Sequence, residues 1–127
     1  MASFPASSPA PTRECGDKIP LVVAQILWRD FGRDERFSAY LRGTNDVMCR
    51  EKENMANIAM VVFDKKLMEY FYAILHVHFN DDGGLIGTPG SMVNWKSTKN
   101  EDDWKNEWCN FIGTVYPEEI IQQGCHR

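Results

Sequence analysis

The sequence predicts a single α+β domain in which a small antiparallel sheet of about three to five strands is packed by N-terminal helices and by a C-terminal helix that carries tryptophan. Three observations predict it. Apolar residues recur at helical spacing over residues 17–31, alternate at strand spacing over 70–79, and recur at helical spacing again after Thr98. The length of 127 residues suits one domain.

Composition divides the chain into two parts. Residues 1–16 are rich in proline, serine and alanine and contain few bulky apolar groups. Such a segment buries too little apolar surface to offset the entropy lost on ordering, so we expect a disordered tail there. The whole chain is 43% hydrophobic and 25% charged, which is ordinary globular usage. Residues 17–127 are therefore expected to form the domain.

The first part of that domain is predicted to be helical. Residues 17–31 form the first helix, because Pro20 suits a first turn and Gly32 a helix end. Its expected apolar face consists of Leu21, Ala24, Leu27, Trp28 and Phe31. The β-branched residues between them leave a strand open as an alternative over 21–28. A second helix is expected over 34–42, and a third, capped by Thr44 or Asn45, extends to about Met55.

The middle of the chain is predicted to form the sheet. Residues 58–63 are compact and β-branched, and residues 70–79 alternate between two half-apolar faces. Residues 64–66 and the Asn-Asp-Asp-Gly-Gly segment at 80–84 are typical of turns. A strand resumes at Leu85 and again over 91–95, so the strands are expected to form an antiparallel meander.

A helix with tryptophans is predicted to follow the last strand. Thr98 and Glu101 match the capping box, in which each side chain bonds the other residue's backbone N–H. Four large apolar residues then follow at helical spacing, namely Trp104, Trp108, Phe111 and Ile112. Gly113 is expected to end this helix.

The four cysteines are expected to be reduced thiols. They lie at positions 15, 49, 109 and 125, with none of the paired spacing of a structural zinc site. We find no pattern of a secretory signal at the N-terminus and no apolar run of the roughly 18 residues that span a bilayer. The cytosol or the nucleus is therefore the expected location, with no membrane partner.

Charge disfavours nucleic acid as a partner. The net charge is −4 and the second half of the chain is its acidic half. Binding to a phosphate backbone requires clustered Lys and Arg, and the sequence contains no such cluster. A single-stranded nucleic-acid binder that uses exposed aromatic rings is kept as a weaker alternative.

His76 and His78 form the one pattern with metal-binding character. Strand alternation places both imidazoles on one face, with about 7 Å between their Cα atoms. Asp82 follows at the end of the strand and is a candidate oxygen ligand. A zinc- or metal-dependent enzyme, or a metal-binding protein, is therefore an alternative function. The preferred interpretation is that both histidines face solvent, and no cofactor is expected.

No motif for nucleophilic catalysis or for phosphate binding is present. The leading hypothesis is therefore a non-enzymatic intracellular protein-interaction module, such as an adaptor, regulatory subunit or assembly factor. Its partner would be another protein or a second copy in a homodimer. Tyr and Trp are frequent interface anchors, and two tyrosines share the face of the histidines. The candidate interface consists of Tyr70, Tyr72, His76, His78 and Trp95.

Overall fold

The structure, a computed structural model, describes residues 15–126. The predicted disordered tail, residues 1–16, lies outside the described residues except for its last two positions. Of these, Cys15 is buried in the core and Gly16 begins a short 3-10 turn. The compact part of the chain therefore begins no later than Cys15.

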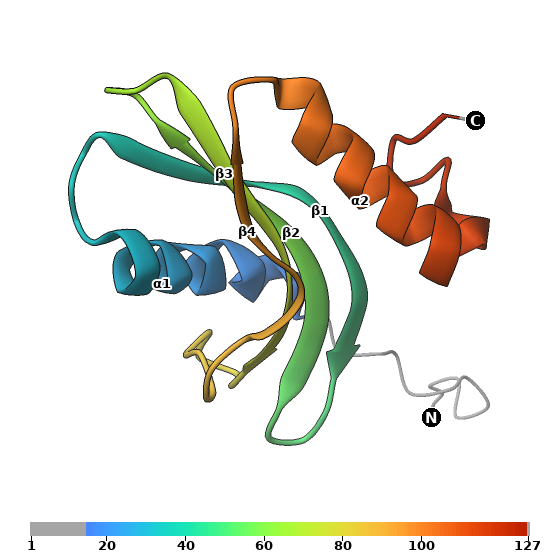
Figure 1. Cartoon of the computed structure of the whole chain (residues 1–127). Coiled ribbons are helices and arrows are strands. Elements are labelled where there is room, and N and C mark those ends of the chain that lie inside the picture. Colours follow the sequence, from blue (N-terminus) through green and yellow to red (C-terminus); the bar gives the residue numbers. More distant parts are fainter. Residues whose placement is uncertain (1–14, 127) are drawn as a thin grey trace, which may run out of the picture.

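The predicted α+β class and the antiparallel meander are confirmed (Figure 1). One sheet has its four strands in the order β1-β2-β3-β4, and all neighbours are antiparallel. In chain order the elements are η1 (Gly16–Lys18), α1 (Ile19–Phe31), β1 (Phe37–Cys49), β2 (Asn54–Asp64), β3 (Glu69–Phe79), β4 (Gly90–Thr98), α2 (Glu101–Val115) and η2 (Pro117–Glu119).

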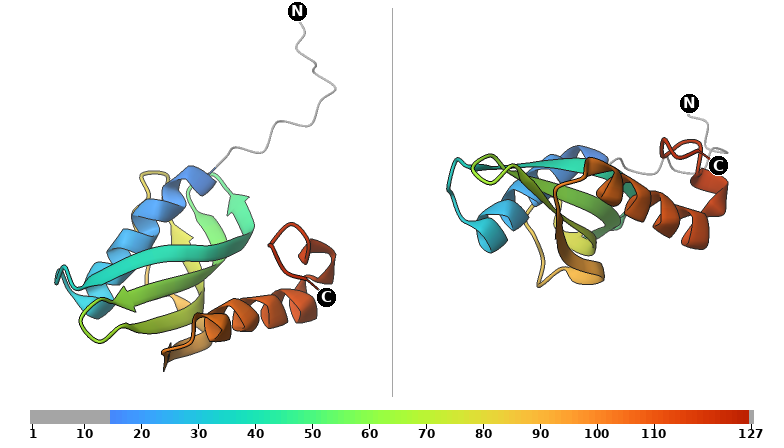
Figure 2. Two further views of the ribbon diagram at one scale, coloured as in Figure 1. Left: turned by 90° about the horizontal axis from the view of Figure 1, so that it is seen from above. Right: turned by 45° about the horizontal axis from the view of Figure 1, so that its top comes forward.

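The two α-helices cover opposite faces of the sheet (Figure 2). Strand alternation divides the apolar residues between these faces. In β2, Ile58 and Met60 face α1, whereas Ala59 and Val61 face α2. The paired central strands β2 and β3 are therefore apolar on both sides. Within the described residues, no helix has the length and hydropathy needed to cross a membrane.

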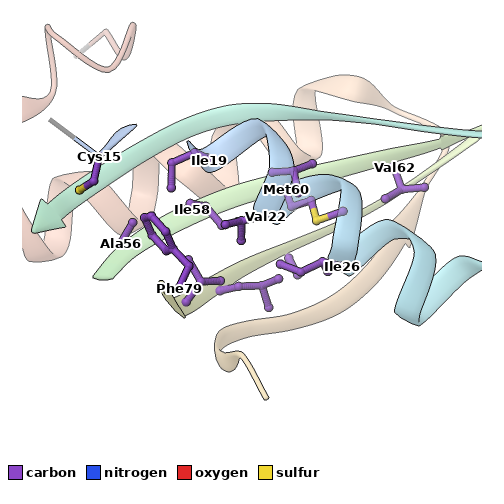
Figure 3. Packing of buried hydrophobic residues seen from close by; sticks show 13 residues of the cluster. Cys15, Ile19, Val22, Ile26, Ala56, Ile58, Met60, Val62 and Phe79 are labelled. Carbon is purple, nitrogen blue, oxygen red and sulfur yellow. The ribbon is translucent and has the colours of Figure 1, made fainter. Parts of the chain in front are cut away.

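Helix α1 is present as predicted, but its predicted buried face was only partly right: Leu27 and Phe31 do pack against the core, whereas Leu21, Ala24 and Trp28 are exposed. Its buried residues are Ile19, Val22, Val23 and Ile26, which pack on β2 and β3 (Figure 3). Leu21 and Trp28 are instead 50% and 55% exposed. Both sets of residues have helical spacing, so the periodicity of the sequence could not choose between them. The face of α1 that packs on the sheet has four buried residues, and all four are β-branched.

The second and third predicted helices were wrong, because residues 34–55 belong mainly to β1 and the start of β2. The register of β1 shifts at two places, between Leu41 and Gly43 and between Asn45 and Met48. A bulge inserts an extra residue into the strand and breaks the period of two. The apolar residues that suggested a helix over 34–42 precede the first shift: Phe37 and Leu41 pack on the α1 side of the sheet, and Tyr40 contacts Trp104 on the other side. Because both faces of this strand carry apolar residues, their spacing resembles that of a helix.

Helix α2 is also present, with a different cap and end. The side chain of Asn100, not Thr98, accepts a hydrogen bond from the Asp102 backbone N–H at 2.9 Å. Thr98 instead accepts a hydrogen bond from the Asn100 N–H and donates one to the Asp103 carboxylate. The helix continues through Gly113 to Val115, since glycine is tolerated inside a helix at a modest cost.

The prediction of reduced cysteines was wrong. Cys15 is bonded to Cys49, and Cys109 to Cys125, so none of the four is free. The bonded cysteines are 34 and 16 residues apart in the sequence. Spacings of this length do not indicate which cysteines pair. The first bond ties the chain before α1 to the end of β1. The second ties the middle of α2 to the C-terminal segment.

Candidate functional site

The histidines of β3 lie on the face that α2 covers. Along this face, Tyr72 packs on Trp104 near the start of α2, and Ile74 packs on Trp108 in its middle. His76 and His78 are the next two residues of β3 on the same face and remain half-exposed. The end of this sheet face is therefore polar and open, next to the segment that follows α2.

A chain of hydrogen bonds fixes the tautomer of His76. Tyr116 donates its hydroxyl proton to the Asp46 carboxylate at 2.7 Å and accepts from Asn57 Nδ2 at 3.2 Å. Asn57 therefore turns its Oδ1 towards His76 Nδ1, at 2.8 Å, and this nitrogen must be the donor. The hydrogen bond to Asp46, aided by burial, raises the pKa of Tyr116. In the neutral form of this tautomer, the lone pair of the ring lies on Nε2.

His78 is oriented in a similar way by a carboxylate. Its Nδ1 contacts the side chain of Glu53, the residue just before β2. The ring centroids of His76 and His78 are 4.8 Å apart in an edge-to-face arrangement. An Nδ1–H bonded to an oxygen acceptor is also the usual second contact of a metal-ligating histidine.

A complete metal centre is not assembled within residues 15–126, because no three His, Cys, Asp or Glu side chains form a group that could hold an ion. Asp82, the predicted oxygen ligand, lies exposed in the turn after β3, where its N–H is bonded to Asn80. The thiol of Cys125 is used by its disulfide. Among residues 15–126, the two histidines are the ligands that the structure brings together here.

The five predicted interface residues do not form one surface. Tyr72 is only 8% exposed, and Tyr70 contacts Phe63 and Trp104. Trp95 lies on the opposite face of the sheet, where it packs on Phe31 of α1 and donates a hydrogen bond to Asp30. Only His76 and His78 of the set lie together and partly open to solvent.

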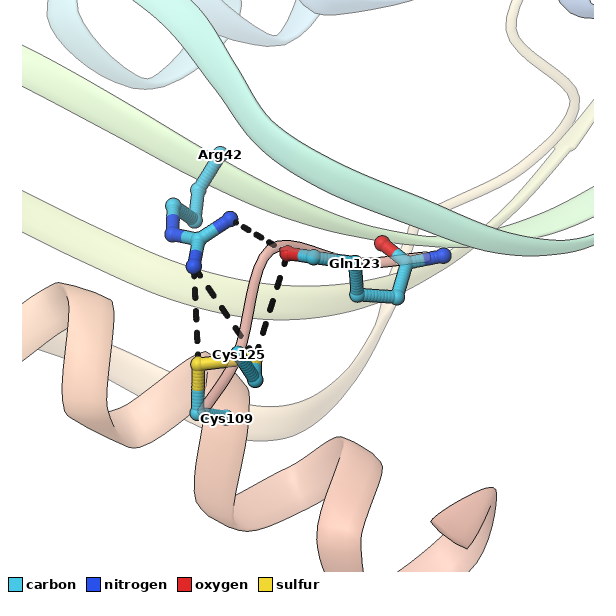
Figure 4. The surroundings of a disulfide bond; sticks show 4 residues. All are labelled: Arg42, Cys109, Gln123 and Cys125. Atoms are coloured by element: carbon cyan, nitrogen blue, oxygen red, sulfur yellow. Dashed lines mark hydrogen bonds between the residues drawn. A yellow bond between two sulfur atoms is a disulfide. The ribbon is translucent and has the colours of Figure 1, made fainter. Parts of the chain in front are cut away.

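The segment after α2 folds back onto β1 around a half-buried arginine (Figure 4). Arg42 donates to the Gln123 carbonyl at 3.0 Å and to Cys109 Sγ at 3.4 Å. Burial lowers the pKa of its guanidinium. Two shallow hollows of about 360 and 390 Å³ lie beside the disulfide, and both are lined by Ile120 and His126. They contain no constellation of catalytic groups.

The outer side of α1 presents a second apolar stripe, absent from the predicted site. Leu21, Ala24 and Trp28 follow one another at spacings of three and four, and all are exposed. The guanidinium of Arg33 lies over the Trp28 ring, 4.2 Å from its centroid. We call these four residues, together with Asp17 one turn before Leu21, the α1 stripe. The helical spacing of Leu21, Ala24 and Trp28 is visible in the sequence, but it led us to expect these residues in the core.

Other residues of the site were missed because they were placed in a wrong element. Asn45 and Asp46 belong to β1, whereas the sequence predicts a helix there. Asn57 belongs to β2, one residue before the predicted strand over 58–63. Comparison with known proteins adds no assignment, since no family model, curated protein or solved structure matches the chain.

Proposed function

We propose that the chain is a non-enzymatic protein-interaction module, acting as an adaptor, regulatory subunit or assembly factor. The observation that carries this proposal is the α1 stripe. Leu21 and Trp28 are half exposed on the outside of a helix whose inner face is already buried in the core. A soluble helix normally presents a polar outer face, and exposed apolar groups at helical spacing are typical of binding surfaces.

The composition of the stripe supports this function. Trp and Arg are the residue types that most often dominate binding energy at protein interfaces. In this chain the Arg33 guanidinium is already stacked on the Trp28 ring before any partner binds. Such preorganisation reduces the side-chain entropy lost on binding. The stripe replaces the set Tyr70, Tyr72 and Trp95 as the proposed contact surface.

The compartment in this proposal differs from the expected cytosol or nucleus. Two disulfides pair all four cysteines. Structural disulfides persist in oxidising compartments and are rare in the reducing cytosol. We therefore place the module in an oxidising compartment.

A photo-crosslinking amino acid at position 24, in the middle of the stripe, tests the function. The full chain is expressed in its native source, irradiated, and analysed by mass spectrometry. A binding module is expected to cross-link through position 24 but not through position 106, an exposed site on α2 that serves as the control. If position 24 yields no specific cross-link, the stripe is not a binding surface and the proposal is wrong.

Metal binding is the second candidate, favoured by the arrangement of His76 and His78. The Nδ1 atom of each ring contacts an oxygen of Asn57 or Glu53, which directs each Nε2 away from these partners. Two imidazoles suit zinc or copper, but two ligands alone give a weak site. We expect the purified protein to hold no stoichiometric metal. Elemental analysis tests this expectation. One zinc per chain that is lost in His76→Ala/His78→Ala but kept in His126→Ala would favour metal binding over protein interaction as the function.

The weaker alternative, binding to single-stranded nucleic acid, gains no support. It needs several neighbouring exposed rings on which successive bases stack, together with a positively charged groove. Trp28 supplies one exposed ring. Tyr72 is buried beneath α2, and Trp95 packs edge-to-face on Phe31.

A further inference from the structure

We infer that the α1 stripe binds the same stripe on a second copy of this chain, so that the two α1 helices pair antiparallel about a two-fold axis. This inference rests on the proposed function, because it names the partner of the same surface. It is carried by the order of the residues along the stripe: an acid, an aliphatic residue, a small residue, an aromatic ring and a guanidinium.

The order is self-complementary. In a two-fold contact, residue i of one copy meets residue j of the other, and j meets i. Leu21 and Trp28 are placed symmetrically about positions 24 and 25. An antiparallel pairing centred there sets Leu21 of each copy against Trp28 of the other. One side of Leu21 contacts Gly83 and half of its surface stays exposed. Trp28 is also half exposed, beside Arg33. Each side chain therefore offers apolar area to the other.

The small residue lies where the helices must approach most closely. Ala24 is exposed at the centre of the stripe. A methyl group at the crossing point allows two helix axes to lie about 8 Å apart, at the short end of the usual range. A bulky residue at this position would hold the axes apart and separate Leu21 from the indole of the second copy.

Charge complementarity supports the same pairing. Asp17, in η1 before the helix, and Arg33, in the turn after it, lie at opposite ends of the stripe, and their midpoint is close to that of Leu21 and Trp28. The Asp17 carboxylate is 68% exposed and lies 3.6 Å from the ammonium of the half-exposed Lys18, a surface pair that is easily exchanged. Arg33 is exposed and stacked on Trp28. The pairing therefore sets Asp17 of each copy opposite Arg33 of the other. Of the acids near Arg33, Asp30 contacts Trp95 and Arg29, and Asp34 accepts a hydrogen bond from the Arg36 N–H.

The contact is expected to be weak, since one pair of short helices lies at the lower end of interface size. Sedimentation velocity on the full disulfide-bonded chain, over a series of protein concentrations, should show a reversible monomer–dimer equilibrium. Trp28→Glu should weaken association at least about tenfold, because it replaces an aromatic anchor with a charge. Ile121→Glu, at a site that is 86% exposed elsewhere on the chain, should leave it unchanged.

Charge reversal gives the sharper test. Asp17→Arg and Arg33→Asp should each weaken the dimer several-fold, because each variant sets like charges opposite one another. The double variant should recover most of the loss. Asp17 lies in η1 before α1 and Arg33 lies in the turn after it, so the two are separated by the whole length of the helix and only a contact between two chains can produce the recovery. Circular dichroism and thermal melting show that each variant is folded.

The outcomes separate this inference from the function on which it rests. A parent chain that stays monomeric at every concentration, or a double variant no better than the worse single variant, overturns the self-association. A position-24 cross-link to a different protein also overturns it but leaves the interaction module in place. A position-24 cross-link to a second copy supports both, and the absence of any specific cross-link removes both.

Discussion

Trp108 of α2 packs its indole directly against the backbone of Gly43 in β1. A Cβ atom at Gly43 would lie 2.5 Å from Trp108 Nε1 and 2.9 Å from Gln123 Oε1. The bulge between Leu41 and Gly43 brings this glycine to the contact. The depth at which α2 sits on the sheet therefore depends on the absence of a side chain at one position of an edge strand.

The first prediction follows from this contact. Gly43→Ala should destabilise the fold by about 1–3 kcal/mol, since the added methyl group overpacks a fully buried ring. Urea unfolding of the variant and the parent measures the difference. Gly113→Ala in α2 is the matched control, because its Cβ would meet Ile120 at an ordinary 3.7 Å. That change should stabilise the protein slightly, since alanine is the better helix former. Equal stability of parent and Gly43→Ala would show that α2 moves freely on the sheet.

The second prediction concerns α2. Trp108→Ala should cost on the order of 3–5 kcal/mol, because Trp108 is fully buried between the helix and the sheet. Asn100→Ala should cost about 1 kcal/mol, the usual effect of removing an N-cap. Thr98→Ala should cost less, because Thr98 does not bond the first-turn N–H groups of the helix. Thermal unfolding orders the three variants, and a larger loss at Thr98 than at Asn100 would restore the capping box that the sequence predicted.

The third prediction concerns the second disulfide. Intact mass under non-reducing conditions should be lower than the reduced mass by four hydrogens, because all four cysteines are paired. The bond between Cys109 and Cys125 closes a loop of 16 residues, for which the chain-entropy model gives a stabilisation of about 3 kcal/mol. Cys109→Ser/Cys125→Ser should lose about that amount in urea unfolding. Titration of free thiols in the parent without denaturation would contradict the pairing.

The fourth prediction concerns pH and Asp64. Its carboxylate is fully buried and accepts hydrogen bonds from Arg36 and from the N–H groups of Lys66 and Leu67. Burial alone would raise the pKa of Asp64, but these hydrogen bonds outweigh it and hold the pKa below its usual value. The folded pKa is thus lower than the unfolded pKa. The stability that the carboxylate contributes is complete above the unfolded pKa and is lost as the pH falls through the folded pKa.

Asp64→Asn provides the measurement. The difference in unfolding free energy between parent and variant should be largest near neutral pH and should shrink as the solution is acidified. Asp82→Asn, at an exposed position, controls for the loss of one negative charge. A difference that stays constant down to strongly acidic pH would show that the ionised form of Asp64 does not stabilise the fold.

How much of the site the sequence predicts depends on the element concerned. The alternation of residues 70–79 correctly placed His76 and His78 on one face, because a strand with a period of two carries that information locally. The same alternation put Tyr70 and Tyr72 beside the histidines, but it did not show that α2 would cover the tyrosines and stop short of the imidazoles. Which part of a sheet face stays open depends on an element some thirty residues away.

Patterns within a few residues were sufficient to predict the α+β class, the turns that follow the strands at 58–63 and 70–79, and the two long helices, although a strand stayed open over 21–28. Tertiary structure alone decided which of two helical stripes α1 buries, and it turned the predicted helices over 34–55 into paired strands. It also decided the cysteine pairing. In each case the local sequence was compatible with more than one arrangement, and contacts between distant segments selected one: α1 on β2 and β3, β1 paired with β2, and Cys109 beside Cys125.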